Sequence, residues 1–177
     1  NRFVLETEAE LVACANSIRA ALEGLVHAIY FATAMDQLSG RDRLDVNRVS
    51  PEKVLKRLQS ALAGASALAH PLAVLIDDPV WRCLRTVDNL AKHRGYARAS
   101  LSLMHSASDG WPRMLLTDHP AGVDWPDDVD DLWGLLRLAH DRVSRCVVES
   151  GIELNKWLVL QQVLPAGELG AAGIKLG

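Results

Sequence analysis

The chain has 177 residues, of which 49% are apolar and 23% charged, and its formal net charge at pH 7 is −3. This composition is that of an ordinary globular domain with a sizeable core. The acidic balance excludes a general polyanion binder, so any nucleic-acid contact must come from a local basic patch.

The first predicted helix covers residues 3–38, and no proline interrupts it. Its apolar residues fall alternately four and three positions apart, which is the spacing of one helical face. They are Leu11, Ala15, Ile18, Leu22, Leu25, Ile29 and Ala32. Ser39-Gly40 supplies a stop, and residues 40–49 read as a polar connection.

Two dipeptides mark the starts of the next helices. Ser50-Pro51 provides an N-cap and a proline at the first helical position, and Asp78-Pro79 repeats this signal. We expect the second helix to end or kink at His70-Pro71, because the residue before a proline is disfavoured in helical conformation. The third helix runs to Arg94 or Gly95.

Residues 96–118 contain two short segments of alternating polarity, which predict a β-hairpin or an ordered loop. A fourth helix is predicted from Pro126 to Ser150, where Gly151 ends it, and a last amphipathic helix covers residues 152–164. The expected fold is therefore an all-α bundle of four to five helices with a small non-helical insertion. We expect one domain over residues 1–164 and a Gly-rich C-terminal tail over residues 165–177.

The three cysteines are Cys14, Cys83 and Cys146, and each lies among apolar residues of a predicted helix. We expect reduced, buried thiols in a cytoplasmic protein. Zinc-type cysteine pairs and runs of ~20 apolar residues are both absent from the sequence, so we expect no metal, no cofactor and no membrane span. Among weaker candidates, His27 is expected to make an interhelical hydrogen bond, and His140 stands beside Asp141.

The third predicted helix carries a cluster of chemistry-bearing residues. Arg85, Asn89 and His93 are spaced i, i+4 and i+8, so they stay near one helical face. Four further basic residues surround them, which are Arg82, Lys92, Arg94 and Arg98. An imidazole transfers protons near neutral pH, and a guanidinium holds a phosphate through two hydrogen bonds.

A purely structural interpretation of this cluster is also open. Cations near a helix C-terminus complement the helix dipole and stabilise it by about 0.3–1 kcal/mol. Five aspartates between residues 124 and 131 are available to pair with the basic residues inside the molecule. The same cluster would then belong to a non-catalytic helical dimerisation or interaction module.

The segment Asn89-Leu90-Ala91-Lys92-His93-Arg94, followed by a loop and a long final helix, resembles the HEPN superfamily. The hydrophobic arm LVHAIYFATAMDQL and the segment SPEKVLKRL also resemble the corresponding helices of that superfamily. Its members are small helical proteins, many of them metal-independent endoribonucleases or RNA-binding components of prokaryotic toxin and defence systems. The layout extends over residues 10–160, while the sequence-specific part is about six residues.

The resemblance implies roles for individual residues. His93 would be the proton-transfer group, Asn89 the orienting group, and Arg85 or Arg94 the phosphate contact, with Lys92, Arg82 and Arg98 binding substrate. Active relatives carry an arginine at the position that Asp88 occupies, so the Arg-His motif is degenerate in this chain, which leaves both an active and a non-catalytic member open. The resemblance also implies a homodimer through the face that contains the third helix, with RNA or a further protein as partner.

Overall fold

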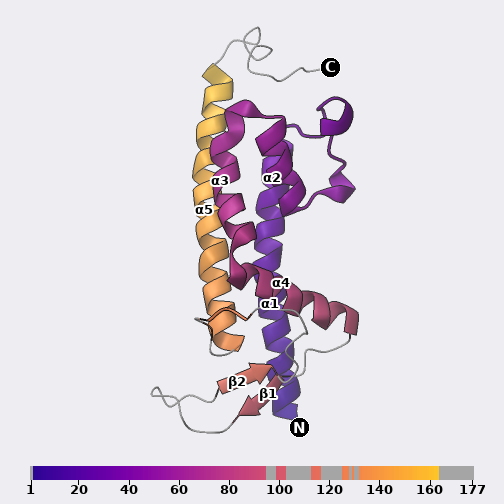
Figure 1. The fold of residues 1–177 in the computed structure, drawn as a ribbon, viewed down its shortest axis with the longest axis vertical. Coiled ribbons are helices and arrows are strands. Elements are labelled where there is room, and N and C mark those ends of the chain that lie inside the picture. The colour runs from indigo at the N-terminus through magenta and orange to yellow at the C-terminus, as the bar shows by residue number, and fades with distance from the viewer. Residues whose placement is uncertain are drawn as a thin grey trace. The chain divides into compact units, whose positions relative to one another are not determined.

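The computed structural model describes residues 2–94, 99–102, 113–116, 125–127, 129 and 132–163. Its helices form an all-α bundle, which confirms the predicted fold class (Figure 1). The helices are α1 (Arg2–Ala32), α2 (Pro51–Ser60), α3 (Ser66–Asp77), α4 (Pro79–Arg94) and α5 (Leu132–Val163). The strands β1 (Ala99–Ser102) and β2 (Arg113–Leu116) pair antiparallel between α4 and α5, as a hairpin requires.

The chain divides into two compact units, and α1 and α5 each contribute to both. The first unit comprises Asn1–Arg19 and Asp77–Arg142, and the second comprises Ala20–Ile76 and Val143–Gly177. The single domain over residues 1–164 stays a prediction, and the predicted tail lies outside the described residues.

The core of the first unit is built from the apolar stripes of α1, α4 and α5. Each stripe repeats at three and four residues, so it forms one continuous helical face. The buried members are Leu11, Ala15 and Ile18 of α1, Val80, Trp81 and Leu84 of α4, and Leu132, Leu135, Leu136 and Ala139 of α5.

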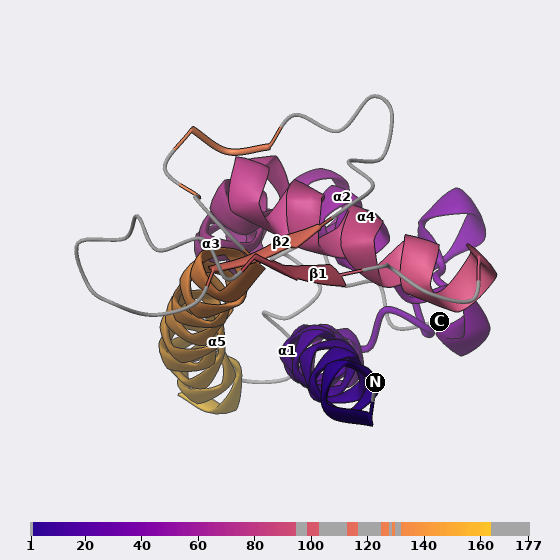
Figure 2. The same ribbon diagram turned by 90° about the horizontal axis from the view of Figure 1, so that it is seen from below.

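The core of the second unit gathers side chains from α1, α2, α3 and α5, and α3 runs alongside α5 in both ribbon views (Figures 1 and 2). The buried members include Leu22, Ile29 and Tyr30 of α1, Val54 and Leu58 of α2, Leu68, Leu72 and Leu75 of α3, and Val143, Cys146 and Trp157 of α5. The predicted polar connection between α1 and α2 contains two turns of 3₁₀ helix, Gly40–Asp42 and Val46–Arg48. Tyr30 fixes this connection, because its hydroxyl donates to the Leu44 carbonyl at 3.0 Å.

The first helix is shorter than predicted, because α1 ends at Ala32 rather than at residue 38. Ala34 has a left-handed backbone with φ of 48°. Its amide donates to the Phe31 carbonyl and the Met35 amide donates to the Tyr30 carbonyl, both at 3.2 Å. These bonds form a Schellman motif, which normally has glycine at the left-handed position. This helix end could not be predicted from the sequence, because alanine and not glycine occupies the left-handed position.

Three other predicted boundaries are wrong. The predicted second helix does not end at Pro71, since α3 continues through it, and α5 continues through Gly151. Pro71 gives up one backbone hydrogen bond, but it is buried among apolar residues of α3 whose burial outweighs that loss. Helix α5 begins at Leu132 rather than at Pro126, because the Val129 amide closes a turn onto the Pro126 carbonyl at 3.0 Å.

Candidate functional site

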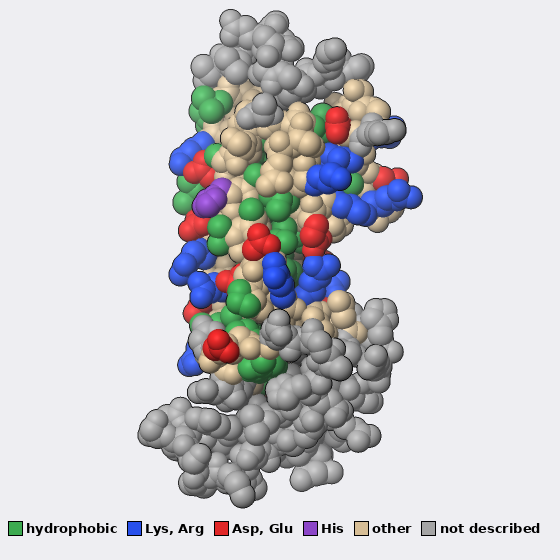
Figure 3. Space-filling model, viewed as in Figure 1, with side chains coloured by type: hydrophobic (Ala, Val, Ile, Leu, Met, Phe, Trp, Pro, Cys, Tyr) green, Lys and Arg blue, Asp and Glu red, His purple; other side chains and the backbone are tan. Residues whose placement is uncertain are grey.

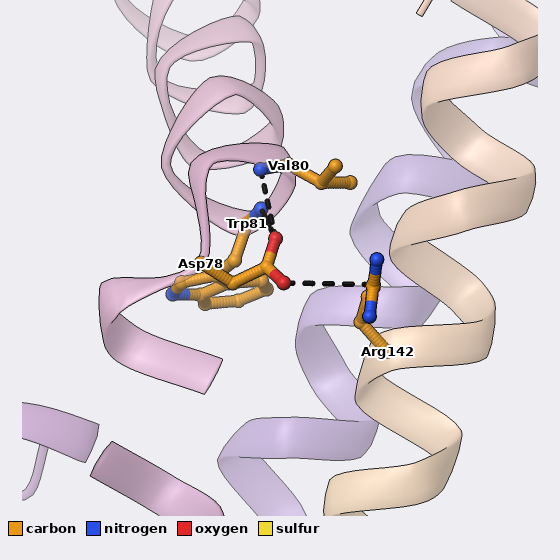
Figure 4. A network of polar contacts seen from close by, with 4 residues as sticks. All are labelled: Asp78, Val80, Trp81 and Arg142. Atoms are coloured by element: carbon orange, nitrogen blue, oxygen red, sulfur yellow. Dashed lines mark hydrogen bonds and ion pairs between the residues drawn. The ribbon is translucent and has the colours of Figure 1, made fainter. Parts of the chain in front are cut away.

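Helix α4 carries the candidate residues, and Asp78 fixes its start as the sequence predicted. One carboxylate oxygen of Asp78 accepts hydrogen bonds from the backbone amides of Val80 and Trp81, at 2.9 and 3.4 Å. The other lies 3.5 Å from Nε of Arg142 on α5 (Figure 4). A helix N-terminus carries partial positive charge, so a carboxylate there both caps and neutralises it.

In the middle of α4, one face of the helix is exposed and another is buried. Arg85 and Asn89, one turn apart, are both exposed, and so is Arg82 one turn earlier. At 100° per residue, positions 82, 85, 89 and 93 fall within an arc of about 80° on the helix. Three of these four predicted site residues thus share an exposed surface, which we call the α4 arc, and His93 occupies the fourth position on the backbone.

Asp88 points away from the α4 arc. Its side chain is 2% exposed and forms an ion pair with the guanidinium of Arg19 on α1, whose side chain is 31% exposed. Asp88 is therefore part of an internal structural contact. Sequence reasoning missed Arg19, because nothing in a single sequence indicates which residue of α1 meets position 88.

The remaining basic residues of the cluster are described only in part. Arg82 forms an exposed ion pair with Asp77 at 2.8 Å, one residue before the cap of α4. The side chains of Lys92, His93 and Arg94, and all of Arg98, lie outside the described part of the structure. An exposed pair of this kind contributes at most about 1 kcal/mol, so Arg82 exchanges partners at little cost.

The aspartate-rich segment 124–131 is described only in part. Asp127 is exposed, whereas Asp124, Asp128, Asp130 and Asp131 lie outside the described residues. The described arginine pairs of this unit use Asp77, Asp78 and Asp88. Pairing between this segment and the basic cluster stays a prediction.

Two described histidines outside the cluster, His27 and His140, have local partners. Nδ1 of His27 lies 2.8 Å from the carbonyl oxygen of Glu23 on its own helix, so the expected interhelical bond is wrong. His140 lies 3.3 Å from Asp141, and both side chains are exposed. Within the described residues no three His, Cys, Asp or Glu side chains are grouped as metal ligands would be.

Two of the three cysteines are buried as expected. Burial raises the thiol pKa of both Cys83 and Cys146 to about 11, which leaves them protonated and unreactive at neutral pH. Cys14 is exposed, contrary to expectation, because it lies beside the edge of the apolar stripe of α1. Within the described helices, none has the length and apolar character needed to cross a membrane.

Comparisons with protein-family models, with curated proteins and with solved structures returned no match.

Proposed function

We propose that this chain is a HEPN-like RNA-binding protein that holds the phosphate backbone of RNA on the α4 arc without cleaving it. The observation that carries the proposal is the orientation of three neighbouring residues. Arg85 and Asn89 are exposed, whereas Asp88 between them is buried against Arg19. The side chains of Arg85 and Asn89 are therefore exposed on this helix, while the carboxylate of Asp88 is buried.

The chemistry of the α4 arc suits phosphate oxygens. Arginine donates two parallel hydrogen bonds to a phosphate, and an asparagine amide donates a further one. Phosphate contacts of this kind supply sequence-independent affinity, and they need only a local patch on an acidic chain. RNA follows as the ligand class from the resemblance of segment 89–94 to the HEPN superfamily.

Binding without cleavage follows from position 88. A cleaving relative places an arginine there, close to the histidine that transfers the proton. Here that position holds a buried aspartate engaged by Arg19. Arg85 is eight residues before His93, an axial rise of about 12 Å, so the two positions suit separate phosphates of a strand better than one reacting phosphate.

The wider setting rests on the same resemblance. It supports a cytoplasmic component of a prokaryotic toxin or defence system that works as a homodimer or with a second protein. The same resemblance also allows an active enzyme, in which His93, with Arg85 and Asn89, cleaves RNA without a metal. The experiment below tests for this activity as well.

A second candidate function is a non-catalytic interaction module. It is favoured by the ion pairs of α4, since Arg82 bonds Asp77 and Asp88 bonds Arg19. In this case the charged residues of α4 brace the bundle, and the α4 arc has no RNA affinity.

The experiment is a titration of a fluorescently labelled single-stranded RNA of about 20 nucleotides, read by anisotropy at several salt concentrations. We expect binding that weakens with salt, and at least tenfold weaker binding for Arg85→Ala combined with Asn89→Ala. Arg137→Ala is the matched control, because Arg137 is an exposed arginine on α5 in the same unit. Melting curves of each variant verify that the fold is retained.

The outcomes separate the three functions. Absence of RNA binding, or equal affinity in the double variant and the Arg137→Ala control, overturns the RNA proposal and leaves the interaction module. Intact RNA after prolonged incubation with the wild type supports binding without cleavage. Cleavage that is lost in His93→Ala shows instead an active endoribonuclease.

A further inference from the structure

The second half of α5 exposes apolar side chains along one line. Val148, Ile152 and Val159 are 60, 49 and 58% exposed. With the exposed Asn155 they follow spacings of four, three and four residues, which are the core positions of a coiled coil. We call these four residues the α5 stripe, and Figure 3 shows hydrophobic side chains at the surface over α5, interspersed with charged ones.

The α5 stripe lies opposite the face by which α5 joins its own unit. Ser150 and Trp157, on the other side of the helix, are buried. The helix therefore already has a complete inner face, and the stripe is a second apolar line that no described side chain covers. Exposed apolar residues scattered singly are ordinary, but a heptad line of them on one helix marks an association surface.

Gly151 is a second observation that points to the same surface. Apart from proline, glycine is the least favourable residue in a helix interior, and Gly151 stands in the middle of α5. A side chain added at this position would meet no described atom within 4 Å, so packing inside the chain does not require glycine there. Gly151 lies on one flank of the α5 stripe, as does Leu158 one heptad later.

The opposite flank carries charges of both signs. Glu149 and Lys156 lie there one heptad apart, and both are exposed. Lys156 bonds Glu153 of the same helix at 2.7 Å, and no described cation pairs with Glu149. When an acid and a base lie at equal distances on either side of the centre of a helix surface, a second copy of that surface running in the opposite direction places each acid beside a base.

We propose that a second copy of this chain docks antiparallel on the α5 stripe. In an antiparallel pair of helices, the a positions of one helix face the d positions of the other. Val148 then meets Val159 of the second copy, and Ile152 meets Asn155. Glu149 comes beside Lys156 of the second copy, and Gly151 makes room for Leu158, each twice by symmetry.

The parallel arrangement lacks this complementarity. It brings Glu149 beside Ser144 and Lys156 beside Gly151, so neither charge meets an opposite one. The antiparallel pairing also uses a surface of the second unit, whereas the proposed RNA contact lies on α4 in the first unit. The inference therefore goes beyond the proposed function and does not depend on it.

The first test is the oligomeric state of the intact chain, measured by sedimentation velocity over a hundredfold range of concentration. We expect a concentration-dependent dimer for the wild type and a monomer for Val148→Asp. Val74→Asp is the matched control, because Val74 is a comparably exposed valine on α3 of the same unit. A wild type that is monomeric throughout, or the same loss of dimer in both variants, overturns the proposal.

The second test is a charge exchange that reads the direction of pairing. Glu149→Lys and Lys156→Glu each place like charges together twice, so each should weaken the dimer at least tenfold. The two changes combined restore opposite charges and should return the dissociation constant to within about threefold of the wild type. Single and double variants of equal affinity contradict the antiparallel arrangement. RNA affinity at low protein concentration should stay unchanged in all of them, so failure here and failure of the RNA proposal are distinguishable.

Discussion

Asp88 of α4 and Arg19 of α1 form an ion pair in which the Asp88 side chain is almost fully buried and the Arg19 side chain is about one-third exposed. Removing one partner of a buried pair is strongly destabilising, because the other charge stays behind. Because the Arg19 side chain is already partly exposed, water solvates part of the charge that stays behind, and removing Asp88 costs less than breaking a fully buried pair. We expect Asp88→Asn to lower the free energy of unfolding by about 2–3 kcal/mol, measured by chemical denaturation.

Asp88→Arg tests the same argument with the arginine that the proposed resemblance to the HEPN superfamily implies for an active member. This change places two guanidiniums together at a buried site, so it should destabilise the fold more than Asp88→Asn does. The exposed Asn89→Arg is the control and should change the free energy of unfolding by less than about 0.5 kcal/mol. A stable Asp88→Arg variant with ribonuclease activity would contradict the structural role assigned to Asp88.

The two aspartates before α4 differ in their roles, although they are adjacent in sequence. Asp78 caps the helix and lies near Arg142, whereas Asp77 only joins an exposed pair with Arg82. Asp78→Ala should cost about 1–2 kcal/mol of unfolding free energy, and Asp77→Ala less than about 1 kcal/mol. Asp78→Asn keeps an acceptor for the amides and should fall between them. Equal effects at 77 and 78 would show that the cap contributes little.

Much of this fold was predictable from local signals. The apolar spacings predicted the helical class, and serine or aspartate before proline predicted the starts of α2 and α4, because a cap is a contact between residues two or three apart. The predicted helix ends were wrong where burial of side chains against distant parts of the chain outweighed the local sequence signal. Pro71 and Gly151 lie inside helices whose neighbouring turns are held by buried side chains on one face.

The candidate site was predictable in its positions but not in its orientation. Spacing alone places Arg85, Asn89 and His93 near one face of α4. The buried face of α4 is set by its contact with α1, which is about 70 residues away in sequence. The burial of Asp88 could therefore not be predicted without the structure. The same applies to Cys14, because an apolar neighbourhood in sequence does not place a residue in the core.

The cysteines predict both a labelling pattern and a pH dependence. Cys14 is exposed while Cys83 and Cys146 are buried with pKa values raised from 9.0 to about 11. A thiol reagent at pH 8 should modify one thiol rapidly and two slowly, and Cys14→Ser should remove the fast phase. Both buried thiols stay protonated to a higher pH in the folded state than in the unfolded state. Their full contribution to the free energy of unfolding is therefore present below pH 9. It should decline as the pH rises from about 9 through 11, which denaturation curves at each pH would measure.

The Schellman motif at the end of α1 permits a stabilising substitution. Ala34 has a φ of 48°, a conformation that costs an L-residue with a side chain about 1–2 kcal/mol and costs glycine almost nothing. Glycine also gains entropy in the unfolded chain, which offsets part of this difference. We expect Ala34→Gly to raise the free energy of unfolding by about 0.5–1 kcal/mol. The matched control is Ala28→Gly, at an exposed position inside α1, which should lower it by about 1 kcal/mol. Opposite signs for the same chemical change would confirm that α1 ends at this motif, and a loss of stability at both positions would show that the helix continues past Ala34.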